Sequence, residues 1–352
     1  MRAAEAVRKA CSAGGLDAEH VDVLELAPRW VRGVYGGGFK LLAERAPGVW
    51  RSLYSMSDGP EGDTARWGPV AQRILFREFR RLLRSRPWQY CVSTHFLPTQ
   101  LAARSGAPRF GLVVTDYTLH RYWVQPRVHE YFVGTPDLAD GVRRRVGGAL
   151  VEATGIPVDP VFASVCPRES RAALGLTETQ RVVLVMGGGF GLGTEETAAA
   201  ALALAGTDLR VIVVCGTNAE SRDRLSAVAA SDPRLIVRGY VDDIERYMAA
   251  ADIIVTKPGG LTLSEGFAVG RPMVLTRPLP GHEEANARFL EAAGAALRAR
   301  DGREVRGALE LLFGDAALRA LMTGRIRGLA RPGAAADIAA IVSTRLRMPV
   351  AA

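Results

Sequence analysis

Residues 252–265 (DIIVTKPGGLTLSE) combine the residue types and spacing that are best suited to binding a ligand. An apolar strand leads into a Pro-Gly-Gly turn, and a helix is expected to open through Thr262 and Ser264. Such a junction directs unpaired backbone N–H groups and the positive end of a helix dipole at one point, which suits a diphosphate. Glu265 lies one turn into the helix, where a carboxylate can accept both hydroxyl groups of a ribose. The segment therefore predicts a nucleotide-sugar site.

A second glycine-rich turn, residues 187–193 (GGGFGLG), directly follows the apolar run at residues 182–186. Five of its seven residues are glycine, and Thr194 and Glu195 follow as helix-opening residues. The spacing differs from the dinucleotide-binding fingerprint, so a nicotinamide site is not predicted. Either turn alone is also typical of an ordinary strand–helix junction. Together they favour a phosphate site, whose glycines would be Gly188, Gly189, Gly191, Gly259 and Gly260.

Lys257 stands beside the second of these turns in a chain that has 42 Arg but only 3 Lys. General use of basic residues therefore does not explain a lysine at this position. A compact ammonium group beside a diphosphate is one interpretation, and a solvated lysine is the other.

The composition is that of a globular protein large enough for two domains. With 352 residues, 48% of them hydrophobic, each half can bury a core of its own. The four cysteines show no Cys-x-x-Cys spacing, so neither a zinc site nor a disulfide framework is predicted, and a reducing compartment is expected. We find no basic-then-apolar leader and no long uncharged apolar run, so neither a signal peptide nor a membrane-spanning helix is expected.

The formal charge of +8 is concentrated in the first half of the chain. Residues 1–166 carry 22 Lys+Arg against 16 Asp+Glu, whereas residues 167–352 carry 23 against 21. A basic excess suits either nucleic acid or an anionic membrane surface. No nucleic-acid motif accompanies it, so we expect no nucleic-acid partner and a peripheral position at the cytoplasmic face of a membrane.

Short apolar runs that alternate with helix-length segments predict parallel sheets with crossover helices. In the first half the runs are residues 21–26, 90–94 and 110–115. In the second half they are residues 182–186, 211–215, 235–237, 253–255 and 273–275. Ligands of such sheets bind beyond the carboxyl ends of the strands, so both glycine-rich turns belong at a binding cleft.

The segment GIPVDP (155–160) contains two prolines, which is typical of an interdomain linker, and we place the domain boundary near Phe162. The predicted parts are an N-terminal acceptor domain (1–161), a C-terminal donor domain (162–330) and a C-terminal helical segment (331–352) that packs back on the first domain.

Two segments are candidates for contact with a membrane. Residues 73–86 predict an amphipathic helix with arginines on one face, and we favour a helix packed on the sheet over one lying on a bilayer. Residues 29–54 interleave aromatic residues with cations and glycines, which suits a headgroup boundary, while a pair of ordinary helices is the alternative. The aromatic residues assigned to acceptor or membrane contact are Trp30, Tyr35, Trp50 and, further along, Trp123.

The sequence resembles monogalactosyldiacylglycerol synthases and the related bacterial diacylglycerol glucosyltransferases over nearly its whole length. Residues 256–265, 270–272 (GRP) and 280–286 (PGHEEAN) are similar to that family's donor signature. Residues 94–98, 115–123 (TDYTLHRYW) and 154–160 are similar to its acceptor half and hinge. The resemblance implies an α/β protein of the GT-B type, with two doubly wound Rossmann-like domains facing a cleft. It implies an inverting glycosyltransferase with UDP-hexose as donor and diacylglycerol as acceptor.

The same resemblance implies roles for the donor residues. Glu265 would hold the ribose, and the backbone at Val241 would meet the uracil. Polar contacts to the sugar and phosphates would come from Glu283, Glu284 and Asn286. His282 stands where the family has glutamine, which leaves galactose and glucose both open as the donor sugar. No Asp-x-Asp occurs, and fixed N–H groups can meet the charge of the leaving diphosphate, so no metal or other cofactor is expected.

Asp116, His120 and Trp123 follow one predicted strand, and His95 follows its neighbour. We assign these residues to positioning the acceptor, with Asp116 and His120 as the candidate base pair and His95 as a further catalytic candidate. A structural role for either histidine is the alternative.

In the resembled family, a buried strand and a glycine-rich turn ending in the favoured base, a histidine, precede residues like those at 2–6. The resemblance therefore implies an N-terminal domain that lacks its first strand, with a gap in the middle of its sheet and unpaired ladder groups on both neighbours. It also implies that Met1 is an internal methionine of a longer reading frame. Two further functions stay open: a UDP-GlcNAc transferase acting on a polyprenyl-linked intermediate, and a non-catalytic UDP-sugar-binding protein.

Overall fold

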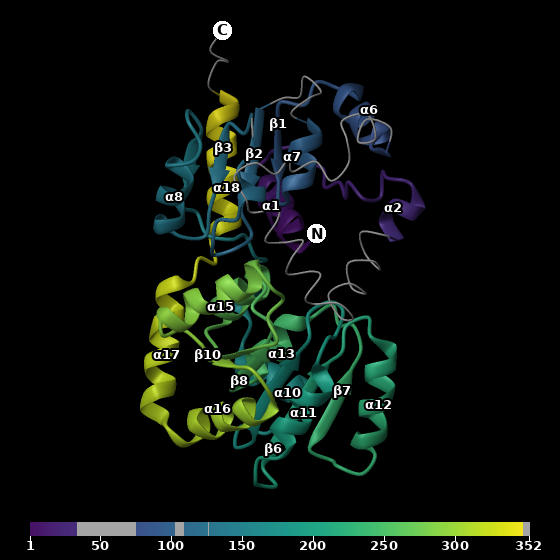
Figure 1. Ribbon diagram of the computed structural model, residues 1–352, viewed down its shortest axis with the longest axis vertical. Helices are drawn as coiled ribbons and strands as arrows, with labels where there is room; N and C mark the ends of the chain where they lie inside the picture. Colours follow the sequence, from purple (N-terminus) through teal and green to yellow (C-terminus); the bar gives the residue numbers. More distant parts are fainter. Residues whose placement is uncertain (34–74, 103–108, 126, 348–352) are drawn as a thin grey trace. The chain divides into compact units, whose positions relative to one another are not determined.

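The computed structural model describes residues 1–33, 75–102, 109–125 and 127–347 (Figure 1). The chain divides into two compact units. Unit 1 consists of Met1–Asp159, Pro280–His282 and Arg331–Ala352, and unit 2 of Pro160–Leu279 and Glu283–Ala330. The first change of unit therefore falls within the Pro-rich segment before Phe162.

Unit 1 contains a four-stranded parallel sheet with the strand order β1-β2-β3-β4. Its strands are β1 (Tyr90–Ser93), β2 (Arg109–Val113), β3 (Glu130–Phe132) and β4 (Leu150–Glu152). The two predicted strands at 90–94 and 110–115 are confirmed, whereas β3 and β4 were not predicted. In the described part of the chain the sheet is continuous and β1 is an edge, so the predicted gap in its middle is wrong.

The predicted strand at residues 21–26 is also wrong, because this segment forms turns. Its residue Val23 is buried with Ala27 against Phe76 and Phe79. The alternation of apolar and charged residues there serves a packed turn instead of a strand.

Helices cover both faces of the unit 1 sheet. They are α1 (Arg2–Ala13), α2 (Arg29–Gly33), α6 (Arg77–Ser85), α7 (Phe96–Ala102), η2 (Arg121–Trp123), α8 (Pro136–Arg143) and α18 (Ala334–Arg347). Because successive side chains of a strand point to opposite faces, Leu112 packs in the core with α8, while its neighbour Val113 packs with α1 and α18. The last helix of the chain thus completes the core of unit 1 beside the first helix.

A buried ion pair fastens α18 to this sheet. Glu130 in β3 is only 1% exposed, and Arg345 Nη2 of α18 donates to its carboxylate at 2.8 Å. The Tyr90 hydroxyl donates to the other carboxylate oxygen at 3.0 Å. Burial, and then the negative charge of Glu130, raise the pKa of Tyr90, so the phenol stays protonated and keeps donating.

Helix α6 packs its apolar side on the protein. Phe76 and Phe79 are buried in one cluster with Val31 of α2 and Leu97 of α7. The predicted packing of this apolar side is confirmed, but its partners are α2, α7 and the turns at residues 23–27, not the sheet.

Unit 2 contains a six-stranded parallel sheet with the order β10-β9-β8-β5-β6-β7. Its strands are β5 (Arg181–Met186), β6 (Leu209–Val214), β7 (Leu235–Arg238), β8 (Ile253–Thr256), β9 (Met273–Thr276) and β10 (Leu297–Ala299). The chain starts in the centre at β5, moves outward to β7, and returns to the centre at β8. This is a doubly wound sheet whose direction of winding reverses between β5 and β8.

The helices of unit 2 precede, separate and follow these strands in sequence. They are α9 (Val161–Ser164), α10 (Pro167–Ala173), α11 (Thr194–Leu202), α12 (Ala219–Ala229), α13 (Ile244–Ala250), α14 (Gly260–Val269), α15 (His282–Ala292), α16 (Gly302–Gly314) and α17 (Ala316–Leu329). Helix α11 packs beside α12 and α16, whereas α13 packs beside α10 and α14. These two groups form layers on opposite faces of the sheet.

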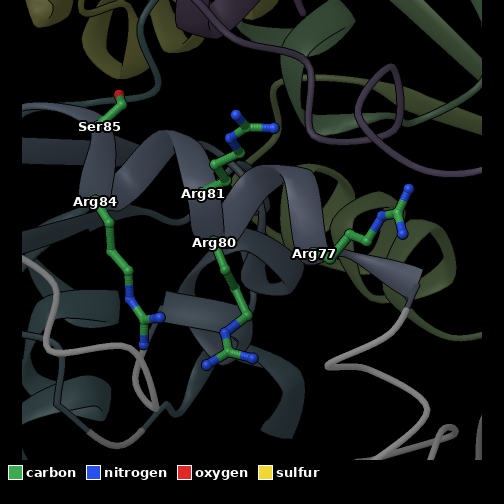
Figure 2. Close-up of a pocket in the computed structure, with 5 residues that line it drawn as sticks. All are labelled: Arg77, Arg80, Arg81, Arg84 and Ser85. Atoms are coloured by element: carbon green, nitrogen blue, oxygen red, sulfur yellow. The ribbon is translucent and has the colours of Figure 1, made fainter.

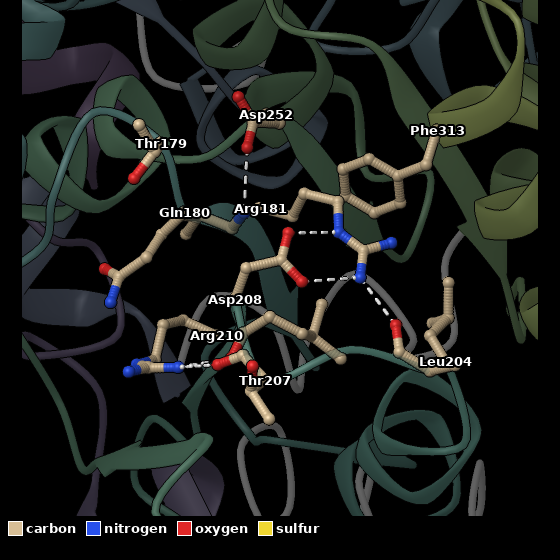
Figure 3. Close-up of polar contacts among 12 residues, drawn as sticks. Thr179, Gln180, Arg181, Leu204, Thr207, Asp208, Arg210, Asp252 and Phe313 are labelled. Atoms are coloured by element: carbon tan, nitrogen blue, oxygen red, sulfur yellow. Dashed lines mark hydrogen bonds and ion pairs between the residues drawn. The ribbon is translucent and has the colours of Figure 1, made fainter.

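Charged side chains anchor the amino ends of the central strands (Figure 3). Asp252 accepts from the Val182 N–H at 2.7 Å and from Arg171 Nη2 at 2.8 Å, which joins the starts of β5 and β8. Arg181 pairs with Asp208 through two bonds of 2.8 Å, and its guanidinium lies 5.4 Å from the ring centre of Phe313. These contacts fix the strands at the end of the sheet opposite the glycine-rich turns.

Among the described residues, no helix has both the length and the apolar character needed to span a bilayer.

Candidate functional site

The two glycine-rich turns lie where the winding of the unit 2 sheet reverses. Residues 187–193 follow β5 and lead into α11, and residues 257–259 follow β8 and lead into α14. Both helices have glycine at the N-cap, Gly193 and Gly259, and neither N-cap supplies a side-chain hydrogen bond. The first-turn N–H groups of both helices therefore point toward one edge of the sheet without a capping side chain from the N-cap residue.

Other helices of the same unit are capped differently. Asn218, Asp301 and Asp315 each accept a backbone N–H at the start of α12, α16 and α17. Side-chain caps are thus present at three helices of unit 2, whereas α11 and α14 lack them, as do α9, α10 and α13.

The turn after β5 is tightly packed on one side and open on the other. A Cβ atom on Gly191 would lie 2.0 Å from the Cys215 carbonyl oxygen, and one on Gly187 would lie 2.4 Å from the Gly191 carbonyl carbon. By contrast, a Cβ atom on Gly188 or Gly189 would meet no atom within 4 Å. The packed glycines let the backbone fold sharply, and the exposed pair leaves room beside the backbone for a ligand.

The neighbouring loop holds this turn in place. The Thr217 N–H and hydroxyl both donate to the Gly189 carbonyl at 3.0 Å. A Cβ atom on Gly216 would lie only 2.4 Å from the same oxygen. The loops after β5 and β6 therefore form one continuous edge.

Val241 belongs to the next loop, which follows β7. It is half-buried, and the adjacent Tyr240 is 66% exposed. Sequence reasoning named the Val241 backbone and missed the exposed tyrosine, because one aromatic residue in a loop is not a distinctive signal.

Helix α15 brings two predicted residues to the turn after β8. Asn286 is fully buried, and its Nδ2 donates to the Pro258 carbonyl at 3.1 Å. Glu283 Oε2 accepts the Leu279 N–H at 2.6 Å, and its Oε1 lies 3.9 Å from where a Cβ atom of Gly259 would be. Asn286 thus holds the backbone just before α14, whereas Glu283 holds the loop after β9 and lies beside Gly259.

The remaining donor candidates have different surroundings. Glu265 is 1% exposed on α14 and lies six residues after the N-cap Gly259, further into the helix than the one turn that its spacing predicted. Lys257, His282 and Glu284 are half-buried, and His282 is the first residue of α15. The structure thus gathers Gly259, Gly260, Glu283 and Asn286 around one turn, with Glu265 on the helix that follows it.

In unit 1 the predicted acceptor residues form an aromatic cluster. The His95 ring stacks on Phe96 with centroids 4.2 Å apart, and its centroid lies 6.4 Å from that of Trp123. Trp123 Nε1 donates to Asp116 Oδ2 at 3.1 Å. His120 joins the same group through Tyr122, whose ring lies 4.7 Å from it and stacks on Phe96.

The hydrogen bonds of the two histidines determine what they can do. His95 Nδ1 accepts the Leu97 N–H at 3.2 Å, and His120 Nδ1 accepts the Tyr122 N–H at 3.1 Å. A neutral ring that accepts at Nδ1 carries its proton on Nε2 and is a donor there, so neither ring can take a proton at Nδ1. Asp116 is the group of this cluster that is best suited to accept a proton.

Desolvation by the surrounding protein lowers the pKa of His95 to about 4, although the nearby Asp116 carboxylate raises it in part. The residue as a whole still keeps exposed surface. His95 is therefore neutral at pH 7 and suited to donating a hydrogen bond.

The residues assigned to acceptor or membrane contact have different environments. Trp30 on α2 is 54% exposed, which suits such a contact. Trp123, assigned to acceptor positioning, is only 5% exposed, and its indole N–H orients Asp116. Tyr35 and Trp50 lie outside the described residues.

A cationic hollow lies on α6, away from the apolar side of this helix (Figure 2). It is lined by Arg77, Arg80, Arg81, Arg84 and Ser85. Arg77 and Arg81 are 3.2 and 4.0 Å from the carboxylate of Glu78, which cannot balance four positive charges.

No group of three or more His, Cys, Asp or Glu side chains in the described ranges is placed to hold a metal ion.

Two protein families match separate parts of the chain. The sequence profile of monogalactosyldiacylglycerol (MGDG) synthase matches residues 1–158, and that of the glycosyltransferase family 28 C-terminal domain matches residues 182–308. A processive diacylglycerol beta-glucosyltransferase of Bacillus pumilus is 34% identical over 192 residues, which are 53% of this chain and 49% of that protein. The chain thus spans about half the length of this relative.

Solved structures support the fold. MurG of Acinetobacter baumannii superposes with a TM-score of 0.57 at 18% identity, covering 82% of this chain and 83% of MurG. Anabaena HepE in complex with UDP superposes with a TM-score of 0.54 at 14% identity, covering 79% of this chain and 83% of HepE. The GT-B fold predicted from the sequence is confirmed. Residues 1–158 are thus similar to monogalactosyldiacylglycerol synthase, and residues 182–308 to the C-terminal domain of glycosyltransferase family 28.

Proposed function

We propose that this chain transfers a hexose, glucose or galactose, from a UDP-sugar to diacylglycerol. One observation carries the proposal: two helices without N-cap side chains, α11 and α14, begin at the reversal point of a sheet that matches the glycosyltransferase family 28 C-terminal domain. The matched relative is named for glucosyl transfer to diacylglycerol, and HepE is solved with UDP. Both support a UDP-sugar donor and a lipid acceptor.

In this proposal the diphosphate binds at the exposed backbone of Gly188 and Gly189 and at the start of α14. The N–H groups and helix dipoles there are fixed before the reaction, so they stabilise the negative charge that grows on the leaving diphosphate without reorganising. Lys257 adds a compact positive charge beside the same turn. No metal and no other cofactor is needed for this stabilisation.

Two groups hold the nucleoside, one at its ribose and one at its base. Glu265, on the first turns of α14, accepts hydrogen bonds from the ribose hydroxyls, and the Val241 backbone pairs with the uracil. The exposed ring of Tyr240 offers a flat apolar surface next to that backbone.

The acceptor hydroxyl is activated in the aromatic cluster of unit 1. Asp116, oriented by the Trp123 indole, accepts the proton of the attacking hydroxyl, while His95 and His120 donate hydrogen bonds from Nε2. A well-placed base of this kind accounts for roughly 10²–10⁴-fold in rate.

A transfer assay tests the reaction directly. Labelled UDP-glucose or UDP-galactose is incubated with vesicles that contain diacylglycerol, and labelled glycolipid is separated by chromatography. Binding of UDP with no transfer from either sugar would contradict the proposal and favour a non-catalytic UDP-sugar-binding protein.

The nucleotide site is tested with Glu265→Ala. We expect UDP binding to weaken by about 1–3 kcal/mol, because charge-assisted hydrogen bonds to the ribose are lost. Calorimetry measures the affinity, and circular dichroism confirms folding. Glu310→Ala, which removes an exposed carboxylate on α16, is the matched control and should leave the affinity unchanged. Unchanged UDP affinity in folded Glu265→Ala would remove Glu265 from the site.

We further propose that the chain works at the surface of an anionic membrane, on its cytoplasmic face, and binds it peripherally. The cationic hollow on α6 supports this, since the apolar side of the helix is already used in the core and leaves electrostatic attraction as the means of binding. The exposed Trp30 on α2, which belongs to the same packed group of helices, suits a headgroup boundary. Binding to vesicles of defined charge tests it.

A further inference from the structure

Arg277 has a backbone conformation that is unusual both for an arginine and for a residue that precedes proline. It directly follows β9 and has a φ of 47°, in the left-handed region that arginine rarely adopts. Among the described residues only Arg127 is a second non-glycine with positive φ. Pro278 comes next, and a residue before proline is normally restricted to extended conformations. The conformation is thus maintained against two local preferences.

This conformation lays the Arg277 side chain across the N-cap of α11. A Cβ atom on Gly193 would lie 2.4 Å from Arg277 Cδ and 3.0 Å from its Nε. Only glycine at position 193 leaves room for the arginine to cross there. The guanidinium therefore lies directly beside the glycine-rich turn and the start of α11.

Glu196 holds the guanidinium in that place. Arg277 Nη2 forms an ion pair with Glu196 Oε2 in the first turn of α11, and Glu196 Oε1 accepts the Gly302 N–H at 3.1 Å. The Arg277 side chain is still 42% exposed, so part of it faces solvent. A guanidinium has five N–H donors in a fixed plane, and a single carboxylate oxygen uses only part of them.

We propose that Arg277 binds the diphosphate of the nucleotide, opposite Lys257 and across the two helix starts. This rests on the proposed function and adds a residue to its donor site. The flat fork of an arginine matches two phosphate oxygens at once, which a lysine cannot do. Glu196 is the positioning residue, because its carboxylate pairs with Nη2 of Arg277 and so orients the rest of the guanidinium.

A purely structural role makes different predictions. If the Arg277–Glu196 ion pair only joined the end of β9 to α11, it would stabilise the fold. Its loss would then weaken the binding of every ligand of the site equally. A diphosphate-binding residue affects UDP and leaves uridine, which has no phosphate, unaffected.

The test uses Arg277→Gly and Arg277→Asn in the full chain, because glycine and asparagine both tolerate a left-handed backbone. Calorimetry compares UDP with uridine. We expect UDP affinity to fall about tenfold or more and uridine affinity to stay unchanged. The thermal midpoint should not fall in Arg277→Gly, since glycine relieves the strain at φ 47°.

Arg224→Ala is the matched control. Arg224 pairs with Glu195, also in the first turn of α11, and its removal should leave UDP affinity unchanged. Equal losses for UDP and uridine, or no loss for UDP in either Arg277 variant, would overturn the inference. Failure of the unaltered protein to bind UDP would instead overturn the proposed function.

Discussion

At the scale of single residues, the acceptor cluster shows how hydrogen bonds assign protons. His95 and His120 each accept a backbone N–H at Nδ1, and both residues lie at the start of a short helical segment. That contact keeps the ring neutral and turns Nε2 into a donor. Asp116 receives its orientation from Trp123, so the candidate base depends on the indole of another residue that the sequence had assigned to acceptor positioning.

The lowered pKa of His95 predicts a pH dependence of stability. Its folded pKa of about 4 lies below the ordinary value of 6.5, so between these values the unfolded chain binds more protons than the folded one. The stabilisation is complete above pH 6.5 and is lost as the pH falls toward 4. Because His95 keeps exposed surface, solvent screening reduces the size of the effect.

Urea unfolding at pH 7 and pH 5 measures this loss. The unaltered protein should lose more stability between the two pH values than His95→Gln, which has no titrating ring. The same pH dependence in both proteins would show that His95 does not have the lowered pKa.

At the scale of elements, one ion pair adds to the apolar packing that attaches α18 to unit 1. Glu130 lies in the middle strand β3 and is closed off from water, and Arg345 reaches it from the last helix. Removing one partner of a buried pair leaves the other charge desolvated, which costs far more than losing an exposed pair. The attachment of α18 is therefore sensitive to a single side chain.

Glu130→Ala should reduce the free energy of unfolding by about 3–5 kcal/mol, because Arg345 loses its buried partner and Tyr90 its acceptor. Glu310→Ala breaks the exposed Arg306–Glu310 pair on α16 and should cost about 0–1 kcal/mol. Urea unfolding followed by tryptophan fluorescence compares them. Similar small losses in both variants would contradict a buried role for Glu130.

At the scale of the whole molecule, the positive charge predicts selective binding to anionic bilayers. Sedimentation with phosphatidylglycerol vesicles should exceed that with phosphatidylcholine vesicles and should fall as salt is added. Glutamine at all four α6 arginines should remove most of this binding, since each cation near such a surface contributes about 1 kcal/mol. These arginines are Arg77, Arg80, Arg81 and Arg84.

The control changes net charge by the same amount elsewhere. Four exposed arginines of α16 and α17 are replaced by glutamine, namely Arg303, Arg306, Arg325 and Arg327. Equal binding to both lipids, or equal losses in the two variants, would contradict a docking role for α6.

Most of unit 2 was predictable from local pattern. Five of its six strands contain an apolar run of three or more residues, and β5, β6, β8 and β9 are buried over nearly their whole length. The short strand β10 has Arg298 at its centre, and β3 begins with the buried Glu130, so neither shows that pattern. The partner of Glu130 is 215 residues away, a pairing that no local pattern can reveal.

The site was predictable to the extent that it depends on glycine spacing. The turns after β5 and β8 were recognised because several glycines precede a helix. Arg277 had no such signal in a chain with 42 arginines, since its distinction is a backbone angle and a contact with Gly193. The predicted base pair of Asp116 and His120 likewise depended on which ring nitrogen was occupied, which sequence does not record.

The place of α18 in unit 1 has a consequence for synthesis on the ribosome. Domains usually fold in the order in which they emerge, with the N-terminal one first. Here the core of unit 1 needs Ile338 and Val342, so that unit cannot finish folding until these residues have left the exit tunnel. Unit 2, which ends at Ala330, emerges in full before then. In the nascent chain the last core residues of unit 1 therefore emerge after those of unit 2, and the sheet of unit 1 stays incompletely packed until then.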